Sequence, residues 1–186
     1  MKYTVAILAA LTMFTIAVPA AEPRTWPADS AYQLEATLTD QDGRAQSLDV
    51  YAGHSVLVTM FYSRCPATCP LIVETLRAIE QATPAAQRTQ LRVLMISIDP
   101  EHDTVAALSA LAKTRRIDTS RWTLARADAA DVRKIAAILN IQYRLLPNGE
   151  YNHSNVITLV SPSGEIVRQS SVIGRVDQDL LAALGP

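Results

Sequence analysis

The residues of this chain whose types and spacing could do chemistry are two cysteines, separated by three residues, and one distant histidine. Cys65 and Cys69 are the only cysteines among the 186 residues, so no other thiol of the chain can bridge with them. Pro66 is typical of a first helical position, because its missing N–H loses no hydrogen bond there. We therefore expect a helix to begin at the pair, with both thiols on one helix face by their i, i+4 spacing. That geometry suits a soft metal ion or a reversible disulfide.

Three interpretations of the cysteine pair are compatible with its residues. A structural disulfide would close a loop of only five residues, which the chain-entropy model values at roughly 2 kcal/mol. Thiol–disulfide exchange is the second, since a helix N-terminus and Arg64 should both favour the thiolate. However, the pair has three intervening residues where thioredoxin-type oxidoreductases have two. Their active site also has a proline directly before the strand that faces the dithiol, and no proline precedes the strand expected at Val156.

Metal binding is the third interpretation, because His153 stands near the place of that proline. Two thiolates and one imidazole form a soft set of three ligands, which suits copper or zinc. A structural zinc site normally has four protein ligands, and this sequence offers three convincing ones. Three ligands with an open side fit a site that must release its metal. Because a lone histidine is more often a polar loop residue than a ligand, the residues alone leave the three interpretations open.

Alternating strands and helices must position these side chains. Hydrophobic periodicity, caps and turn residues predict strands at 32–38, 56–62, 91–98, 122–124, 156–160 and 165–169, and helices at 66–81, from 104, at 128–139 and at 176–184. Turn residues at 40–43 predict an opening hairpin, and Asn148-Gly149 predicts another. This order indicates a mixed α/β fold with a central mixed sheet flanked by helices and an N-terminal hairpin. A dithiol at the first strand-to-helix turn makes the predicted fold thioredoxin-like.

The N-terminal residues predict export. Lys2 gives a short positive start, Val5 to Val18 form an apolar run, and small residues lead to Ala20. We expect a signal peptide at 1–20, a flexible tail at 21–30 and one domain at 31–186. An uncleaved membrane anchor is the alternative, although the apolar run is short for a bilayer. Export indicates a bacterial periplasm, where disulfides can persist.

The charge pattern excludes one class of partner. The chain has 17 basic and 18 acidic residues and a net charge of −1. It has no basic stripe or block, which argues against binding to nucleic acid. We expect a monomer.

Three segments carry a resemblance to a known family. They are Tyr62 to Pro70 (YSRCPATCP), Ile96 to Thr104 (ISIDPEHDT), and Asn152-His153-Ser154 followed by an apolar strand and the turn Ser161-Pro162-Ser163-Gly164. In this order they resemble the Sco/SenC family of exported copper-binding proteins, which have a thioredoxin fold. The resemblance covers roughly residues 30–184. It implies that Cys65, Cys69 and His153 bind one copper ion, as Cu(I) or Cu(II).

The resemblance also implies a function and its partners. The function would be delivery of copper to the binuclear copper centre of a cytochrome c oxidase subunit, with a periplasmic thiol reductant or another copper carrier as further partners. The alternative is a thiol–disulfide oxidoreductase that uses a redox-active Cys65–Cys69 disulfide to keep the recipient's cysteines reduced, so enzymatic activity is left open. Three positions depart from the family pattern: Ala67 and Asn152 replace common acids, and His102 replaces a common arginine. They leave the ligand set intact and the identity of the recipient open.

Overall fold

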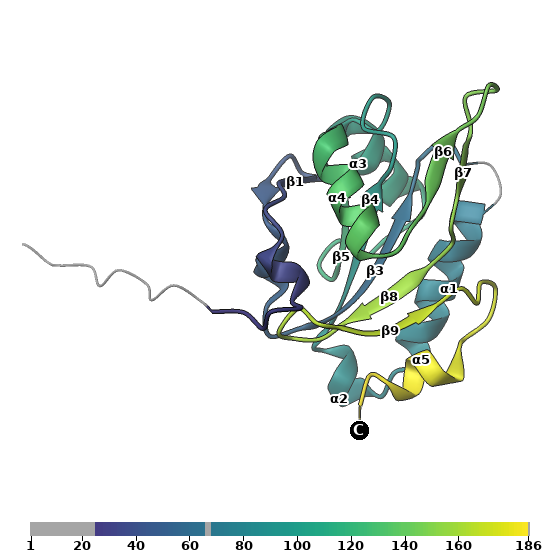
Figure 1. The fold of residues 1–186 in the computed structure, drawn as a ribbon. Coiled ribbons are helices and arrows are strands. Elements are labelled where there is room, and N and C mark those ends of the chain that lie inside the picture. The colour runs from purple at the N-terminus through teal and green to yellow at the C-terminus, as the bar shows by residue number, and fades with distance from the viewer. Residues whose placement is uncertain (1–24, 66–67, 186) are drawn as a thin grey trace, which may run out of the picture.

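The structure is a computed structural model that describes residues 25–65 and 68–185. Within those residues, seven strands form one mixed sheet in the order β2-β1-β5-β4-β3-β8-β9 (Figure 1). The strands are β1 Leu38–Asp40, β2 Ala45–Gln46, β3 Ser55–Phe61, β4 Leu91–Ser97, β5 Trp122–Arg126, β8 Ile157–Val160 and β9 Ile166–Ser170. β3, β4 and β5 are parallel, and the other neighbouring pairs are antiparallel. The predicted mixed sheet and its N-terminal hairpin, β1–β2, are confirmed.

Helices cover both faces of this sheet. The helices are α1 Thr68–Ala82, α2 Ala85–Arg88, α3 Val105–Thr114, α4 Ala129–Ile138 and α5 Gln178–Ala182, with short 3-10 helices η1 Ala31–Gln33 and η2 Leu48–Tyr51. Successive side chains of a strand point to opposite faces. Val56 and Val58 of β3 share a hollow with Ile135 of α4 and with residues of η1 and η2. Phe61 of the same strand lines a pocket with residues of α1 and α3, so these two helices cover the opposite face.

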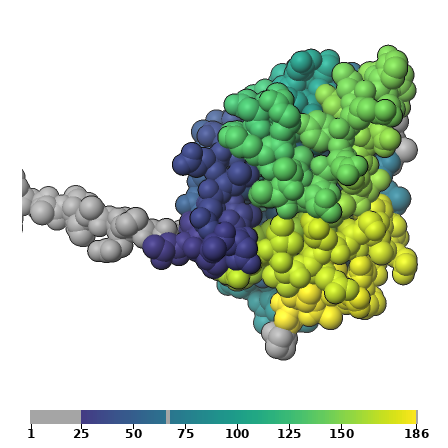
Figure 2. All heavy atoms as spheres, viewed as in Figure 1, coloured from purple at the N-terminus to yellow at the C-terminus, as the bar shows by residue number. Residues whose placement is uncertain are grey.

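A second, two-stranded sheet lies beside the main one and carries His153. It consists of β6 (Tyr143–Leu145) and β7 (Tyr151–His153), which pair antiparallel with Tyr143 opposite His153. The Asn148-Gly149 turn connects the strands as predicted, and Gly149 adopts a φ of +80° that other residues rarely take. The hairpin lies on the opposite side of the molecule from the purple residues that begin at 25 (Figure 2).

The N-terminal part of the domain differs from the sequence prediction. We expected a strand over 32–38, but the strand begins only at Leu38 and Tyr32 lies in η1. The reason is a contact with a distant turn: the Ala31 N–H donates to the Gly164 carbonyl over 2.7 Å, and the Ser30 hydroxyl donates to the Ser163 carbonyl. The segment is therefore docked on the β8–β9 turn.

The predicted signal peptide, residues 1–20, lies outside the described residues, as does the start of the predicted helix at Pro66 and Ala67. Both stay predictions. Among the helices that the structure describes, none is long and apolar enough to cross a membrane.

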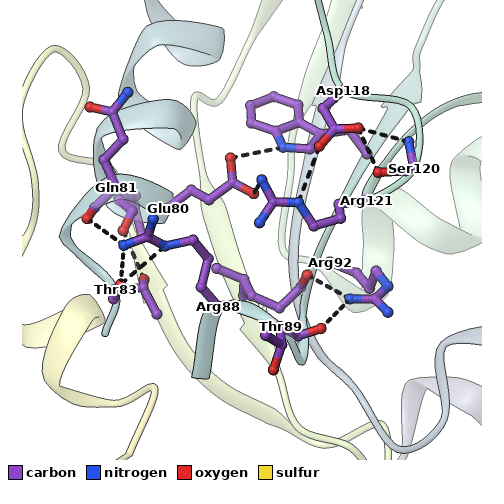
Figure 3. Close-up of polar contacts among 12 residues, drawn as sticks. Glu80, Gln81, Thr83, Arg88, Thr89, Arg92, Asp118, Ser120 and Arg121 are labelled. Atoms are coloured by element: carbon purple, nitrogen blue, oxygen red, sulfur yellow. Dashed lines mark hydrogen bonds and ion pairs between the residues drawn. The ribbon is translucent and has the colours of Figure 1, made fainter. Parts of the chain in front are cut away.

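A buried carboxylate joins the C-terminal end of α1 to the start of β5. Glu80 accepts a hydrogen bond from the indole N–H of Trp122 and pairs with the Arg121 guanidinium over 3.1 Å. Figure 3 shows Arg121 reaching Asp118 as well, over 3.2 Å. The C-terminal end of α1 has a further contact, because the Arg88 guanidinium donates to the main-chain carbonyls of Gln81 and Thr83. These contacts fix the far end of the helix whose first turn carries Cys69.

We expect Glu80→Ala to lower the free energy of unfolding by about 1–3 kcal/mol, because it leaves the buried indole N–H of Trp122 without an acceptor. Urea unfolding measures the change. Glu74→Ala is the matched control, since Glu74 is exposed on the same helix and its ion pair with Arg77 should contribute less than about 1 kcal/mol. Equal losses of unfolding free energy in Glu80→Ala and Glu74→Ala would contradict a stabilising role for the buried contact between Glu80 and Trp122.

Candidate metal centre

The two cysteines lie where β3 leads into α1. The Cys65 N–H donates to the Tyr62 carbonyl over 3.2 Å, which turns the chain directly after the strand. The Cys69 N–H then donates to the Cys65 sulfur over 3.3 Å, so a sulfur accepts from one of the N–H groups that a helix start leaves without a helical partner. Both residues are thiols in this structure and not a disulfide. The predicted placement of the pair at a strand-to-helix turn is confirmed.

The two thiols differ in exposure, and the more buried one has a raised pKa. Cys69 is 7% exposed, whereas Cys65 is half-buried, and both line a pocket between α1, α3 and the sheet. Burial raises the pKa of the Cys69 thiol well above its ordinary range, and Cys65 and Asp103 add to the rise. The expectation that the helix start and Arg64 make the pair acidic is therefore wrong for Cys69. The Arg64 guanidinium instead pairs with Asp99 over 2.8 Å.

His153 is held in the form that can bind a metal. Its Nδ1 lies 3.1 Å from the Ser154 carbonyl oxygen, and because a carbonyl can only accept, Nδ1 carries the proton and Nε2 keeps its lone pair. Burial lowers the pKa of His153 below its ordinary value, so the ring is neutral at neutral pH. A neutral imidazole oriented by a carbonyl is the usual arrangement of a metal-binding histidine.

Tyr62 lies between the cysteines and the histidine. Its ring meets the His153 ring edge-on, with 6.0 Å between centroids, and meets the Tyr151 ring at 5.4 Å. Burial raises the pKa of the Tyr62 hydroxyl, and the neighbouring Cys65 thiol contributes to that rise. The sequence prediction overlooked Tyr62, although its position three residues before Cys65 at the end of a buried strand is a usable signal.

The structure brings the two cysteines together but does not bring His153 into bonding range of both. Across the described ranges 25–65 and 68–185, no three His, Cys, Asp or Glu side chains are close enough to hold one metal ion. His153 lines a separate hollow with other residues of 142–154, whereas the cysteines line the pocket beside α1. The three predicted ligands thus lie around one tyrosine without converging.

An ion-pair cluster lies beside the cysteine loop. Asp99 accepts from Arg64 and lies 2.8 Å from His102 Nδ1. The two groups hold the pKa of the Asp99 carboxyl below its ordinary value even though burial acts in the opposite direction. His102 therefore has a carboxylate partner of its own. This cluster accounts for Asp99 of the 99–103 loop without a cation site.

The chain resembles known proteins over most of its length. The SCO1/SenC family model matches residues 27–182. A mitochondrial SCO2 homolog from Bos taurus is 27% identical over 138 residues, which cover 71% of this chain and 51% of that protein. The chain thus spans about half the length of this relative.

Two solved structures share the fold. ScoI of Bradyrhizobium japonicum, solved with copper bound, is 25% identical with a TM-score of 0.63, over 80% of this chain and 94% of that one. BsSco, described as a member of the Sco family of cytochrome c oxidase assembly proteins and as having a disulfide switch, is 21% identical with a TM-score of 0.65, over 80% and 88%. The predicted thioredoxin-like fold is confirmed. Since the family model covers most of the chain, this protein belongs to the SCO1/SenC family.

Proposed function

We propose that this protein is an exported copper chaperone that binds one copper ion through Cys65, Cys69 and His153 and delivers it to the binuclear copper centre of a cytochrome c oxidase subunit. The observation that carries the proposal is that two reduced thiols share one helix start, while a neutral histidine whose Nε2 keeps its lone pair contacts Tyr62, three residues before Cys65. Membership of the SCO1/SenC family supports copper as the cargo, as does the copper bound to ScoI of Bradyrhizobium japonicum.

The donor set fits copper by its chemistry. Thiolates select copper(I), and imidazole suits copper in either oxidation state. The thiolate is the ligand, so each cysteine releases its proton when copper binds. Burial of Cys69 makes that proton hard to lose without a metal ion, which favours loading by copper over spontaneous ionisation. Three ligands leave an open side at which a recipient's ligands take the copper over.

His153 must approach the cysteines for this site to form. It lies at the end of β7, in a hairpin that pairs only within itself among the described strands. The hairpin can therefore shift toward α1 without breaking a ladder of the main sheet. The ring of Tyr62 contacts the His153 ring before any such shift.

A redox role is the second candidate, and the unequal exposure of the two thiols favours it. Half-buried Cys65 could attack a recipient's disulfide, and Cys69 could then resolve the mixed disulfide, so that the recipient gains two thiols as Cys65 and Cys69 form a disulfide. A periplasmic thiol reductant would restore the pair. The proposed location in a bacterial periplasm suits both roles.

Titration of the reduced and the oxidised protein with copper tests the proposal. We expect the reduced protein to bind one equivalent and the Cys65–Cys69 disulfide form to bind none at the same concentration, because oxidation removes two ligands at once. No stoichiometric binding by the reduced protein, together with rapid reduction of a disulfide peptide that His153→Ala leaves unchanged, would support the redox role instead.

A further inference from the structure

Two carboxylates of the loop between β4 and α3 hold the two residues that directly precede Cys65. Asp103 accepts hydrogen bonds from the Ser63 backbone N–H, at 3.0 Å and 3.3 Å to its two oxygens, and from the Ser63 hydroxyl. Asp99 accepts from the Arg64 guanidinium over 2.8 Å. These contacts join residues 35 to 40 positions apart in the sequence, so they set where the cysteine loop lies on the end of the sheet.

The two contacts differ in strength because they differ in burial. The Asp99 carboxyl is 1% exposed, but its partner, the Arg64 side chain, is 47% exposed, and solvent around one partner weakens an ion pair. Asp103 is 0% exposed, and a buried carboxylate is tolerated only when donors surround it. A hydrogen bond to a charged group is also stronger than one between neutral groups. Asp103 is therefore the dominant anchor of the loop.

Asp103 is itself fixed to the strand beside the site. The Ser97 hydroxyl, at the end of β4, donates to Asp103 and accepts from the Asp99 N–H over 3.0 Å. The Asp103 N–H donates to the Asp99 carbonyl over 2.9 Å. Ser97 is 0% exposed as well. A chain of buried and part-buried hydrogen bonds thus runs from β4 through Asp103 to Ser63, two residues before Cys65.

We propose that Asp103 is a positioning residue for the copper site. It acts through Ser63 to hold Cys65 where Cys65 and Cys69 can bind the same copper ion. This inference rests on the proposed copper binding. Asp103 does not touch the metal ion in this account. It restrains the backbone that carries the first ligand, so its loss should change the geometry and affinity of the copper complex more than the fold.

Asp103→Asn tests the inference, because it keeps the shape of the side chain and replaces one accepting oxygen with a donating NH₂ group. We expect copper affinity to fall by about 10- to 100-fold, the range for groups that orient metal ligands, and the sulfur-to-Cu(II) charge-transfer band to shift. Asp40→Asn is the matched control. Asp40 is 4% exposed and is also held by backbone donors, the N–H groups of Asp42 and Arg44 in the remote β1–β2 turn. It should leave the affinity and the band unchanged.

Ser63→Ala keeps the test decisive if Asp103→Asn does not fold. This variant removes the hydroxyl contact and retains the backbone contact, so we expect a smaller loss of affinity and a shift of the band in the same direction. The inference would be overturned if the wild type binds copper and Asp103→Asn shows the same affinity and the same band. If only Ser63→Ala folds, the same result in that variant would overturn it. Either result would leave the proposed function standing. Failure of the wild-type protein to bind copper would overturn the proposed function, and the inference with it.

Discussion

Replacement of either cysteine by serine is expected to lower copper affinity by more than about 100-fold. A thiolate is a soft, anionic ligand, whereas a serine hydroxyl stays neutral and hard at neutral pH. Loss of a direct ligand should exceed the 10- to 100-fold effect of losing a group that only orients one. Competition with a copper chelator under reducing conditions measures the affinities of Cys65→Ser and Cys69→Ser.

Met95→Leu is the control for these variants. Met95 is a buried sulfur-containing residue that lines the same pocket as the two cysteines. Leucine has a similar volume, so the substitution should lower the free energy of unfolding by less than about 1.5 kcal/mol. Its copper affinity should equal that of the wild type. Wild-type affinity in Cys65→Ser would contradict the ligand set, because a single cysteine with one histidine would then suffice.

Gly164→Ala is expected to lower the free energy of unfolding by about 2–5 kcal/mol. Gly164 has a φ of +90°, and an added Cβ would lie 2.2 Å from the Ser30 hydroxyl oxygen and 2.7 Å from the Tyr32 ring. The left-handed backbone alone costs an alanine about 1–2 kcal/mol, and overpacking adds about 1–3 kcal/mol. Urea unfolding measures the loss. The variant should also release the N-terminal segment from the β8–β9 turn.

Gly149→Ala separates the two causes. Gly149 has a similar φ of +80°, but an added Cβ would meet no atom within 4 Å. We expect a loss of only about 1–2 kcal/mol, which is the backbone effect alone. Equal losses in the two variants would show that the docking of Ser30 and Tyr32 on Gly164 contributes nothing to stability.

Much of the fold could be predicted from the sequence because its signals are local. The branched apolar runs of β3 and β4 indicate buried strands, and Asp128 caps α4 as its side chain and position predict. The prediction of a strand over 32–38 was wrong because the conformation of this segment depends on a distant contact. Ser30 and Ala31 bond to the β8–β9 turn, and no local pattern in the sequence records that contact.

In the candidate site, too, the local features could be predicted from the sequence and the distant contacts could not. The positions of Cys65 and Cys69 follow from their spacing and from the strand before them, both of which are local. The proton on Nδ1 of His153 depends on the Ser154 carbonyl, a main-chain contact that the residue types alone do not indicate. The buried contact of Asp103 with Ser63 spans 40 residues. The two lie together only because β3 and β4 are parallel neighbours whose carboxyl ends meet at one edge.

The most direct test of the proposed site is Cu(II) titration of the reduced protein and two histidine variants, followed by the sulfur-to-copper charge-transfer band. His102 is the matched control for His153, because it lies beside the cysteine loop but is held by Asp99. We expect the wild type to bind one equivalent of copper, His102→Ala to show the same band, and His153→Ala to show a strongly altered band with weaker binding. Identical affinity and spectra in the wild type and His153→Ala would contradict it.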